Sequence, residues 1–115
     1  MTSPYIFHMC PKSLWDDALA TGFYDGSAVD KQDGFIHFST AEQLRETAAR
    51  HRAGEAGLLL LKVDPKTLGE ALKWEKSRRN LLFPHLYDRL SIKDVVSATE
   101  LILGPDGVHI FPDLD

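Results

Sequence analysis

The chain is poor in cysteine, in basic charge and in long apolar runs. Cys10 is its one cysteine, so no internal disulfide can form and a reducing compartment is expected. Lysine and arginine number 13 against 17 aspartate and glutamate, a net charge of −4, which argues against broad nucleic-acid binding. No apolar run approaches the roughly 20 residues of a membrane span, and residues 1–4 lack a signal-peptide pattern. We therefore expect a cytoplasmic protein that makes no membrane contact.

What remains is the composition of a single globular domain spanning residues 1–115. Hydrophobic residues make up 43% of the chain and charged residues 26%, values typical of soluble proteins. A chain of 115 residues can bury one core but is too short for two domains. Two helices are predicted in the N-terminal half and mostly strands after them, an order that indicates the α+β class.

Hydrophobic periodicity and turn residues place the predicted elements. The first helix runs from Ser13, capped through Asp16, to Gly22, and the second covers 41–52 behind a capping box formed by Thr40 and Gln43. Strands are predicted over 5–9, 35–39, 57–63, 72–76, 98–103 and 108–111. The other segments are predicted as a loop over 25–33, one helical turn over 64–69, a proline-broken apolar run over 81–87 and an unassigned stretch over 92–96.

The segment 34–40 is the most suggestive of function. His37 lies near the end of a predicted strand, shortly before the start of a helix. Free backbone N–H groups and the positive end of the helix dipole favour an anion at that point. The hydroxyl groups of Ser39 and Thr40 add further polar contacts there. We therefore predict an anion-binding reaction centre around His37.

Three histidines, His8, His37 and His85, lie in apolar strand-like runs. Polar residues in such runs need a reason, and we predict that folding gathers the three imidazoles around one cavity. Each could instead be a half-buried residue with a satisfied hydrogen bond, as is expected for His51 and His109. A zinc site is a further alternative, because three histidines can hold zinc. No pair has the close spacing of a metal motif, so no metal ligand is assigned.

Other side chains have two interpretations each. Cys10 follows His8 by two residues and is either a thiolate nucleophile or a small buried thiol. Trp15 and Tyr87 are either core aromatics or pocket walls that stack on a ligand ring. A basic cluster could be a solvated turn or could bind phosphates. Its members are Lys73, Lys76, Arg78 and Arg79.

Several motifs together resemble the small bacterial family called Domain of Unknown Function 952. They are Tyr5-Ile6-Phe7-His8, Trp15, Gly22-Phe23-Tyr24, Gly34-Phe35-Ile36-His37-Phe38-Ser39 and Phe83-Pro84-His85-Leu86-Tyr87. The resemblance covers nearly the whole chain. That family in turn resembles the ADP-ribosyltransferase superfamily, in the branch that contains the RNA 2′-phosphotransferases. The shared order is a strand histidine, a helix that ends in glycine and an apolar residue, and a second strand histidine.

This resemblance implies a strand-rich mixed sheet, split around a cleft that holds NAD or another ADP-ribose-type nucleotide. The implied catalytic residues are His8, His37 and Glu75, with Glu75 as the general base. The implied ligand-binding residues are Ser39, Thr40, His85, Tyr87 and Trp15. The phosphotransferases follow the first histidine with Gly-Thr, whereas this chain has Met9-Cys10.

The expected function is therefore transfer of ADP-ribose or cleavage of NAD, with a small nucleotide as partner and an RNA end as a possible acceptor. One alternative is a non-catalytic module that binds a nucleotide or a protein on the same fold. The other is a metal-dependent hydrolase that uses the histidine cluster.

Overall fold

The computed structural model describes residues 4–114. Its largest sheet has the strand order β10-β9-β5-β1-β4, with β10 at His109–Ile110, β9 at Val95–Leu103, β5 at Leu58–Val63, β1 at Ile6–Pro11 and β4 at Ser39–Thr40. A three-stranded sheet has the order β3-β7-β6, with β3 at Ile36–His37, β7 at Leu82–Leu86 and β6 at Leu72–Lys76. A small pair joins β2 (Phe23–Tyr24) to β8 (Leu90–Ser91).

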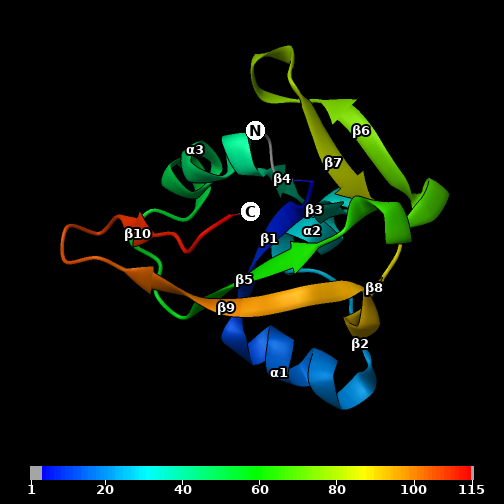
Figure 1. The fold of residues 1–115 in the computed structure, drawn as a ribbon, viewed down its shortest axis with the longest axis horizontal. Helices are drawn as coiled ribbons and strands as arrows, with labels where there is room; N and C mark the ends of the chain where they lie inside the picture. Colours follow the sequence, from blue (N-terminus) through cyan, green and yellow to red (C-terminus); the bar gives the residue numbers. More distant parts are fainter. Residues whose placement is uncertain (1–3, 115) are drawn as a thin grey trace.

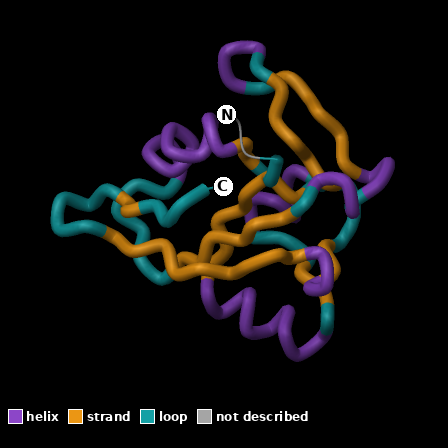
Figure 2. The backbone as a smooth tube through the Cα atoms, in the orientation of Figure 1, coloured by secondary structure: helices purple, strands orange, loops and turns teal. Residues whose placement is uncertain are grey.

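Every strand pair in the described part of the chain is antiparallel. The prediction of a mixed sheet is therefore wrong. Parallel neighbours need a crossover connection, usually a helix packed on the sheet. Here the α-helices connect strands that are not parallel neighbours, so the α+β class is confirmed while the mixed sheet is not (Figures 1 and 2).

Strand β5 is the middle strand of the largest sheet, as its run of leucines predicts. Its side chains alternate between two cores, because successive residues of a strand point to opposite faces. Leu61 and Val63 belong to one core, and Leu58 and Leu60 belong to the other. The predicted burial of this strand on both faces is confirmed.

Two helices cover the two faces of this sheet. Helix α1 (Lys12–Thr21) packs Ala18 into the first core, and helix α3 (Ala41–His51) packs Leu44 and Ala48 into the second. Figure 1 shows α1 below the sheet and α3 above it. Each helix therefore shields one row of the alternating leucine side chains.

The two predicted helix starts have different outcomes. In α3 the capping box is confirmed: the hydroxyl of Thr40 accepts from the N–H of Gln43 at 3.3 Å, and Gln43 Oε1 accepts from the N–H of Thr40 at 3.0 Å. Helix α1 begins one residue before Ser13 and has no side-chain cap, so the predicted start is wrong. Its predicted end at Gly22 is confirmed by the left-handed φ of 92° there.

A third helix, α2 (Ala28–Asp33), lies where a loop was predicted. Ser27 caps it: its hydroxyl accepts from the N–H of Asp30 at 3.4 Å, and the Asp30 carboxylate accepts from the N–H of Ser27 at 2.7 Å. The helix has only six residues, too few to show an apolar period. The spacing of Ser27 and Asp30 was the available signal.

The predicted strand over 35–39 is two strands in different sheets. Residues 36 and 37 pair with β7, whereas residues 39 and 40 pair with β1. Phe38 lies between them and donates its N–H to the carbonyl of Pro84 at 2.9 Å. The chain thus passes from the three-stranded sheet to the five-stranded sheet within this segment.

Single turns of 3₁₀-helix fill the remaining connections. They are η1 (Pro65–Thr67), η2 (Gly69–Ala71), η3 (Arg78–Asn80) and η4 (Ile92–Asp94). The turn predicted over 64–69 is therefore confirmed, and η3 forms the tip of the β6–β7 hairpin (Figure 2). Within residues 4–114, none of the helices is long and apolar enough to cross a membrane.

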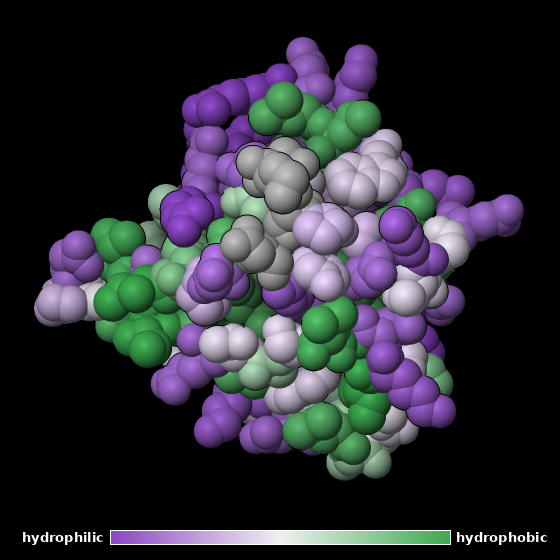
Figure 3. Space-filling view, in the orientation of Figure 1, coloured by the Kyte–Doolittle hydropathy of each residue, from purple (hydrophilic) through white to green (hydrophobic). Residues whose placement is uncertain are grey.

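The β9–β10 hairpin extends away from the rest of the molecule (Figure 1). Its surface is apolar at the left of Figure 3, where Ile102, Val108 and Ile110 are exposed. None of these side chains contributes to the cavity described next.

Candidate functional site

A cavity of about 380 Å³ lies between the five-stranded and the three-stranded sheets. Strands β1 and β4 line it from the first sheet, and β3 and β7 line it from the second. Helices α2 and α3 and the turn η3 complete its wall. His8, His37 and His85 all line it, which confirms that folding gathers the three strand histidines around one cavity.

Asp30 is the buried centre of the polar network in this wall. Its Oδ1 lies 2.5 Å from Nδ1 of His37 and accepts the backbone N–H of His37 at 3.1 Å. Its Oδ2 accepts from the N–H and the hydroxyl of Ser27 at 2.7 and 3.0 Å. Burial alone would raise the pKa of Asp30, but the hydrogen bonds from His37 and Ser27 outweigh burial and hold this pKa far below its usual range. Asp30 is therefore a fixed carboxylate behind His37.

His37 lies between two carboxylates and is 36% exposed. Asp30 holds Nδ1, and Oδ2 of Asp33 lies 3.0 Å from Nε2. The hydrogen bond to Asp30, with the nearby charge of Asp33, raises the pKa of His37 above its ordinary value. A general acid or base requires a buried carboxylate on one nitrogen and access to the other, which His37 would have once the exposed side chain of Asp33 moves off Nε2.

His8 is buried, and both of its ring nitrogens are occupied. Nδ1 lies 2.6 Å from the carbonyl oxygen of His37, and Nε2 lies 2.6 Å from the hydroxyl of Tyr24. Burial lowers the pKa of His8, so the ring is neutral. Its Nδ1–H then donates to the carbonyl and its Nε2 accepts from Tyr24. His8 thus fixes the backbone of His37, and its predicted catalytic role stays a prediction.

His85 joins a second polar group at the edge of the cavity. Oε1 of Glu75 accepts from Nδ1 of His85 at 2.9 Å and from the hydroxyl of Tyr87 at 2.6 Å. Both hydrogen bonds lower the pKa of Glu75, and the bond from Tyr87 has the larger effect. The ring of Phe35 lies between His85 and His37, with centroid distances of 4.1 and 4.5 Å. The predicted residues Glu75, His85 and Tyr87 do meet, but of these three only His85 lines the cavity.

The predicted phosphate site at the start of α3 is only partly present. Ser39 lines the cavity, and its hydroxyl donates to Oγ1 of Thr47 at 3.3 Å. Thr40 does not line it, because its hydroxyl caps the helix. Gln43 in the first turn of α3 donates from Nε2 to the carbonyl of Leu82 at 2.8 Å, which ties this helix start to β7.

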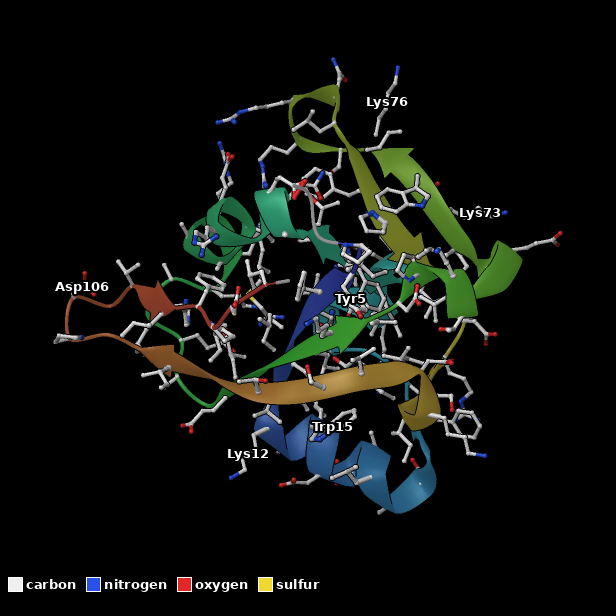
Figure 4. The ribbon with its side chains drawn as sticks, viewed as in Figure 1. Tyr5, Lys12, Trp15, Lys73, Lys76 and Asp106 are labelled. Carbon is white, nitrogen blue, oxygen red and sulfur yellow. The ribbon has the colours of Figure 1, made fainter. Side chains whose placement is uncertain are left out.

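Trp15 does not reach the cavity either. It lies on α1, where Figure 4 labels it, and packs against the first core. Of the two interpretations of this residue, the core aromatic is confirmed. Its stacking on a ligand ring stays a prediction, with no support from the lining of this cavity.

The predicted basic cluster is divided between two places. Lys73 and Lys76 point outward from β6 (Figure 4). Arg78 lines the cavity, and Arg79 is exposed and pairs with Oε2 of Glu46 on α3 at 3.0 Å. Two more basic residues of α3 and its C-terminal end, His51 and Arg52, also line the cavity. The cavity therefore has a second wall with the guanidinium groups of Arg52 and Arg78, besides the Asp30–His37–Asp33 wall.

Two alternatives lose support from this geometry. Cys10 is fully buried, and burial raises the pKa of its thiol to about 11, so it is not a thiolate nucleophile at neutral pH. For a metal-dependent hydrolase, three or more donors must converge. In the described part of the chain, no group of three or more His, Cys, Asp or Glu side chains is placed to hold a metal ion.

Comparisons with known proteins identify the family and no activity. Residues 9–98 match the family model "Protein of unknown function (DUF952)". No curated protein matches the chain. The X-ray crystal structure of protein CC0527 from Caulobacter crescentus is 47% identical, with a TM-score of 0.89 and coverage of 92% of this chain and 93% of that one.

The solution NMR structure of the same Caulobacter protein gives a consistent result. It is 48% identical, with a TM-score of 0.82 and coverage of 91% of this chain and 90% of that one. None of these matches is described as an ADP-ribosyltransferase, so that part of the predicted resemblance is not supported. The match over residues 9–98 is most of the chain, which therefore belongs to the family of proteins of unknown function DUF952.

Proposed function

We propose that the cavity between the sheets binds NAD or a related ADP-ribose-type nucleotide, and that His37 takes a proton during its conversion. The observation that carries this proposal is the opposite charge of the two cavity walls. Asp30, Asp33 and His37 form one wall. Arg52 and Arg78 lie in the other.

NAD has a charge distribution complementary to these walls. Its nicotinamide ring is positive, and a ribose separates this ring from a negative diphosphate. The carboxylate of Asp33 suits the positive end, and the arginines suit the diphosphate. The cavity volume of about 380 Å³ is near the lower end of the roughly 300–1,000 Å³ usual for ligand pockets. We therefore place the nicotinamide ribosyl end inside and the adenosine end outside.

The proposed reaction uses His37 as the general base. The bond between ribose C1′ and the nicotinamide nitrogen breaks, and neutral nicotinamide leaves with the bonding electron pair. The oxygen of an acceptor hydroxyl, or of water, bonds to C1′. Its proton passes to Nε2 of His37, after the side chain of Asp33 has moved off that nitrogen and the nitrogen has given its own proton to solvent. Asp30 stabilises the resulting imidazolium through Nδ1, and solvent then removes the proton.

The second candidate is a module that binds the nucleotide without turnover. Two observations favour it. Both nitrogens of His8 are occupied by hydrogen bonds, and Glu75 does not line the cavity. Two of the three implied catalytic residues thus have no evident access to a ligand.

Titration with NAD, ADP-ribose and a 2′-phosphorylated RNA end, followed by calorimetry and by histidine NMR resonances, tests binding. Release of nicotinamide, measured by chromatography, tests turnover. We expect His37→Asn to reduce release by about 10²- to 10⁴-fold, the usual contribution of a general base. The matched control is His109→Asn, because His109 lies in β10 and is bonded to the carbonyl of Glu55, away from the cavity.

Binding without release in the unchanged protein would select the non-catalytic module. No binding of any of these ligands at millimolar concentration, with the His37 resonances unmoved, would overturn both candidates.

A further inference from the structure

We infer that Arg78 is the anchor for an oxyanion of the ligand, either a phosphate or a carboxylate. Its Nε is a buried side-chain nitrogen that finds no hydrogen-bond partner in the described part of the chain. Buried polar groups are nearly always paired, so this guanidinium group, which lines the cavity, has hydrogen-bonding capacity that the described residues do not use. The inference rests on the proposed function only in requiring that a ligand occupy this cavity.

The guanidinium group of Arg78 is held in place by its neighbours. Its side chain is 15% exposed, and its Nη2 donates to Oγ1 of Thr47 at 3.0 Å. Its central carbon lies 5.0 Å from the ring centroid of Phe83. The nearest carboxylate oxygen, Oε2 of Glu46, is 3.4 Å from Nε without forming a hydrogen bond. An oxyanion could therefore bind without first ordering a flexible side chain.

The charge around Arg78 also favours an anion. The single carboxylate of Glu46 faces the guanidinium groups of Arg50, Arg78 and Arg79 at 3.1, 3.4 and 3.0 Å. One negative charge thus balances only one of three positive charges. The excess lies beside the cavity, where an anion would neutralise it.

Thr47 supplies a second donor at the same place. Its Oγ1 accepts from Nη2 of Arg78 and from the hydroxyl of Ser39. Thr47 lines the cavity, and its hydroxyl can rotate to donate to a ligand while its oxygen still accepts from Arg78. The guanidinium group of Arg78 and the hydroxyl of Thr47 can then donate to two oxygens of one oxyanion, an arrangement that suits both phosphate and carboxylate.

The backbone of η3 brings Arg78 to this position. Arg79 and Asn80 both have φ of 58°, a left-handed conformation that is uncommon outside glycine. These two residues make the tight return from β6 to β7, at the hairpin tip beside α3 (Figure 1).

Calorimetric titration with inorganic phosphate, and separately with malonate, at constant ionic strength tests the inference. We expect Arg78→Lys to weaken binding of the preferred anion at least about tenfold, because lysine keeps the charge but loses the planar donor fork. Arg79→Lys is the matched control, since Arg79 pairs with the same Glu46 but is 63% exposed and does not line the cavity. We expect it to change affinity by less than about twofold. Thr47→Val, which removes the second donor, is the backup variant if Arg78→Lys does not fold.

The outcomes separate this inference from the proposed function. Phosphate or malonate binding that depends on Arg78 and Thr47 supports the anchor even if NAD does not bind. The anion that binds more tightly indicates whether the acid group of the ligand is a phosphate or a carboxylate. If the unchanged protein binds neither phosphate nor malonate at tens of millimolar, the inference that Arg78 anchors an oxyanion is wrong. If NAD binds and both Arg78→Lys and Thr47→Val keep this binding, the inference is also wrong. The role of His37 is then decided by its own test.

Discussion

At the scale of single residues, the protonation of His37 depends on two carboxylates in different surroundings. Asp30 is buried and has four hydrogen-bond contacts, whereas Asp33 is 44% exposed and touches Nε2 of His37. Substitution of Asp30 would disturb the start of α2 and the backbone of His37 together. Asp33 can be changed with little effect on folding, so it is the better site for a test.

We predict that Asp33→Asn lowers the pKa of His37 toward its ordinary value of 6.5, because one of the two raising charges is removed while Asp30 stays. NMR titration of the His37 ring protons measures this pKa directly. Asp25→Asn is the control, since Asp25 pairs with Arg89 and does not contact His37. An unchanged or higher pKa in Asp33→Asn would contradict the description of this site.

The sequence identified the three histidines of the cavity but not the carboxylate that organises them. His8, His37 and His85 each stand out as a polar residue in an apolar run, which is a local signal. Asp30 lies in a polar segment and gives no such signal. Its burial also depends on β1, where Nε2 of His8 lies 3.6 Å from Oδ2 of Asp30, a contact between distant parts of the sequence that local pattern does not encode.

At the scale of elements, the start of α3 is the clearest agreement between pattern and structure. Thr40 and Gln43 satisfy each other's N–H groups, and Thr40 does not line the cavity. Thr40→Ala should therefore lower the free energy of unfolding by about 1 kcal/mol, and Thr40→Ser should restore most of it. Urea unfolding measures both.

The same variants separate a cap from a ligand contact. We expect the affinity for phosphate to be unchanged in Thr40→Ala, because the oxyanion donors are placed at Arg78 and Thr47 instead. A loss of affinity equal to that of Thr47→Val would restore the original prediction of a phosphate site at this helix start.

Strongly patterned elements were predictable, whereas the start of the nine-residue β9, which lies in the unassigned stretch over 92–96, was not. The leucine run of β5 and the alternation of β6 fix both strands within one residue. The break at Phe38 was not predictable, because it depends on the carbonyl of Pro84, which lies far along the chain. Local residues 35–39 are uniformly suited to a strand, and only the pairing partners divide them.

At the scale of the whole molecule, His8 and His37 give opposite dependences of stability on pH. The pKa of His37 is raised on folding, so its contribution is complete below about pH 6.5 and is lost as pH rises through its folded pKa. The pKa of His8 is lowered on folding, so the unfolded state binds more protons below about pH 6.5 and stability falls with acidification. The pKa of His51 is also lowered and acts in the same direction as His8.

We therefore predict a maximum in the thermal unfolding midpoint near pH 6.5, measured between about pH 5 and 8.5. His37→Gln should flatten the alkaline side, and His8→Gln should flatten the acid side. Solvent screening of its partly exposed ion pairs reduces the effect of His37. A midpoint that rises steadily across this range in the unchanged protein would contradict the assignment.

The passage of the chain through Phe38 fixes the separation of the two sheets at the histidine end of the cavity. His37 and Ser39 belong to different sheets but are two residues apart, so covalent geometry fixes their spacing. At the opposite side, Arg78 and Arg79 reach α3 only through side chains. Covalent geometry therefore positions the proton acceptor, whereas hydrogen bonds and ion pairs position the anchor for the acid group.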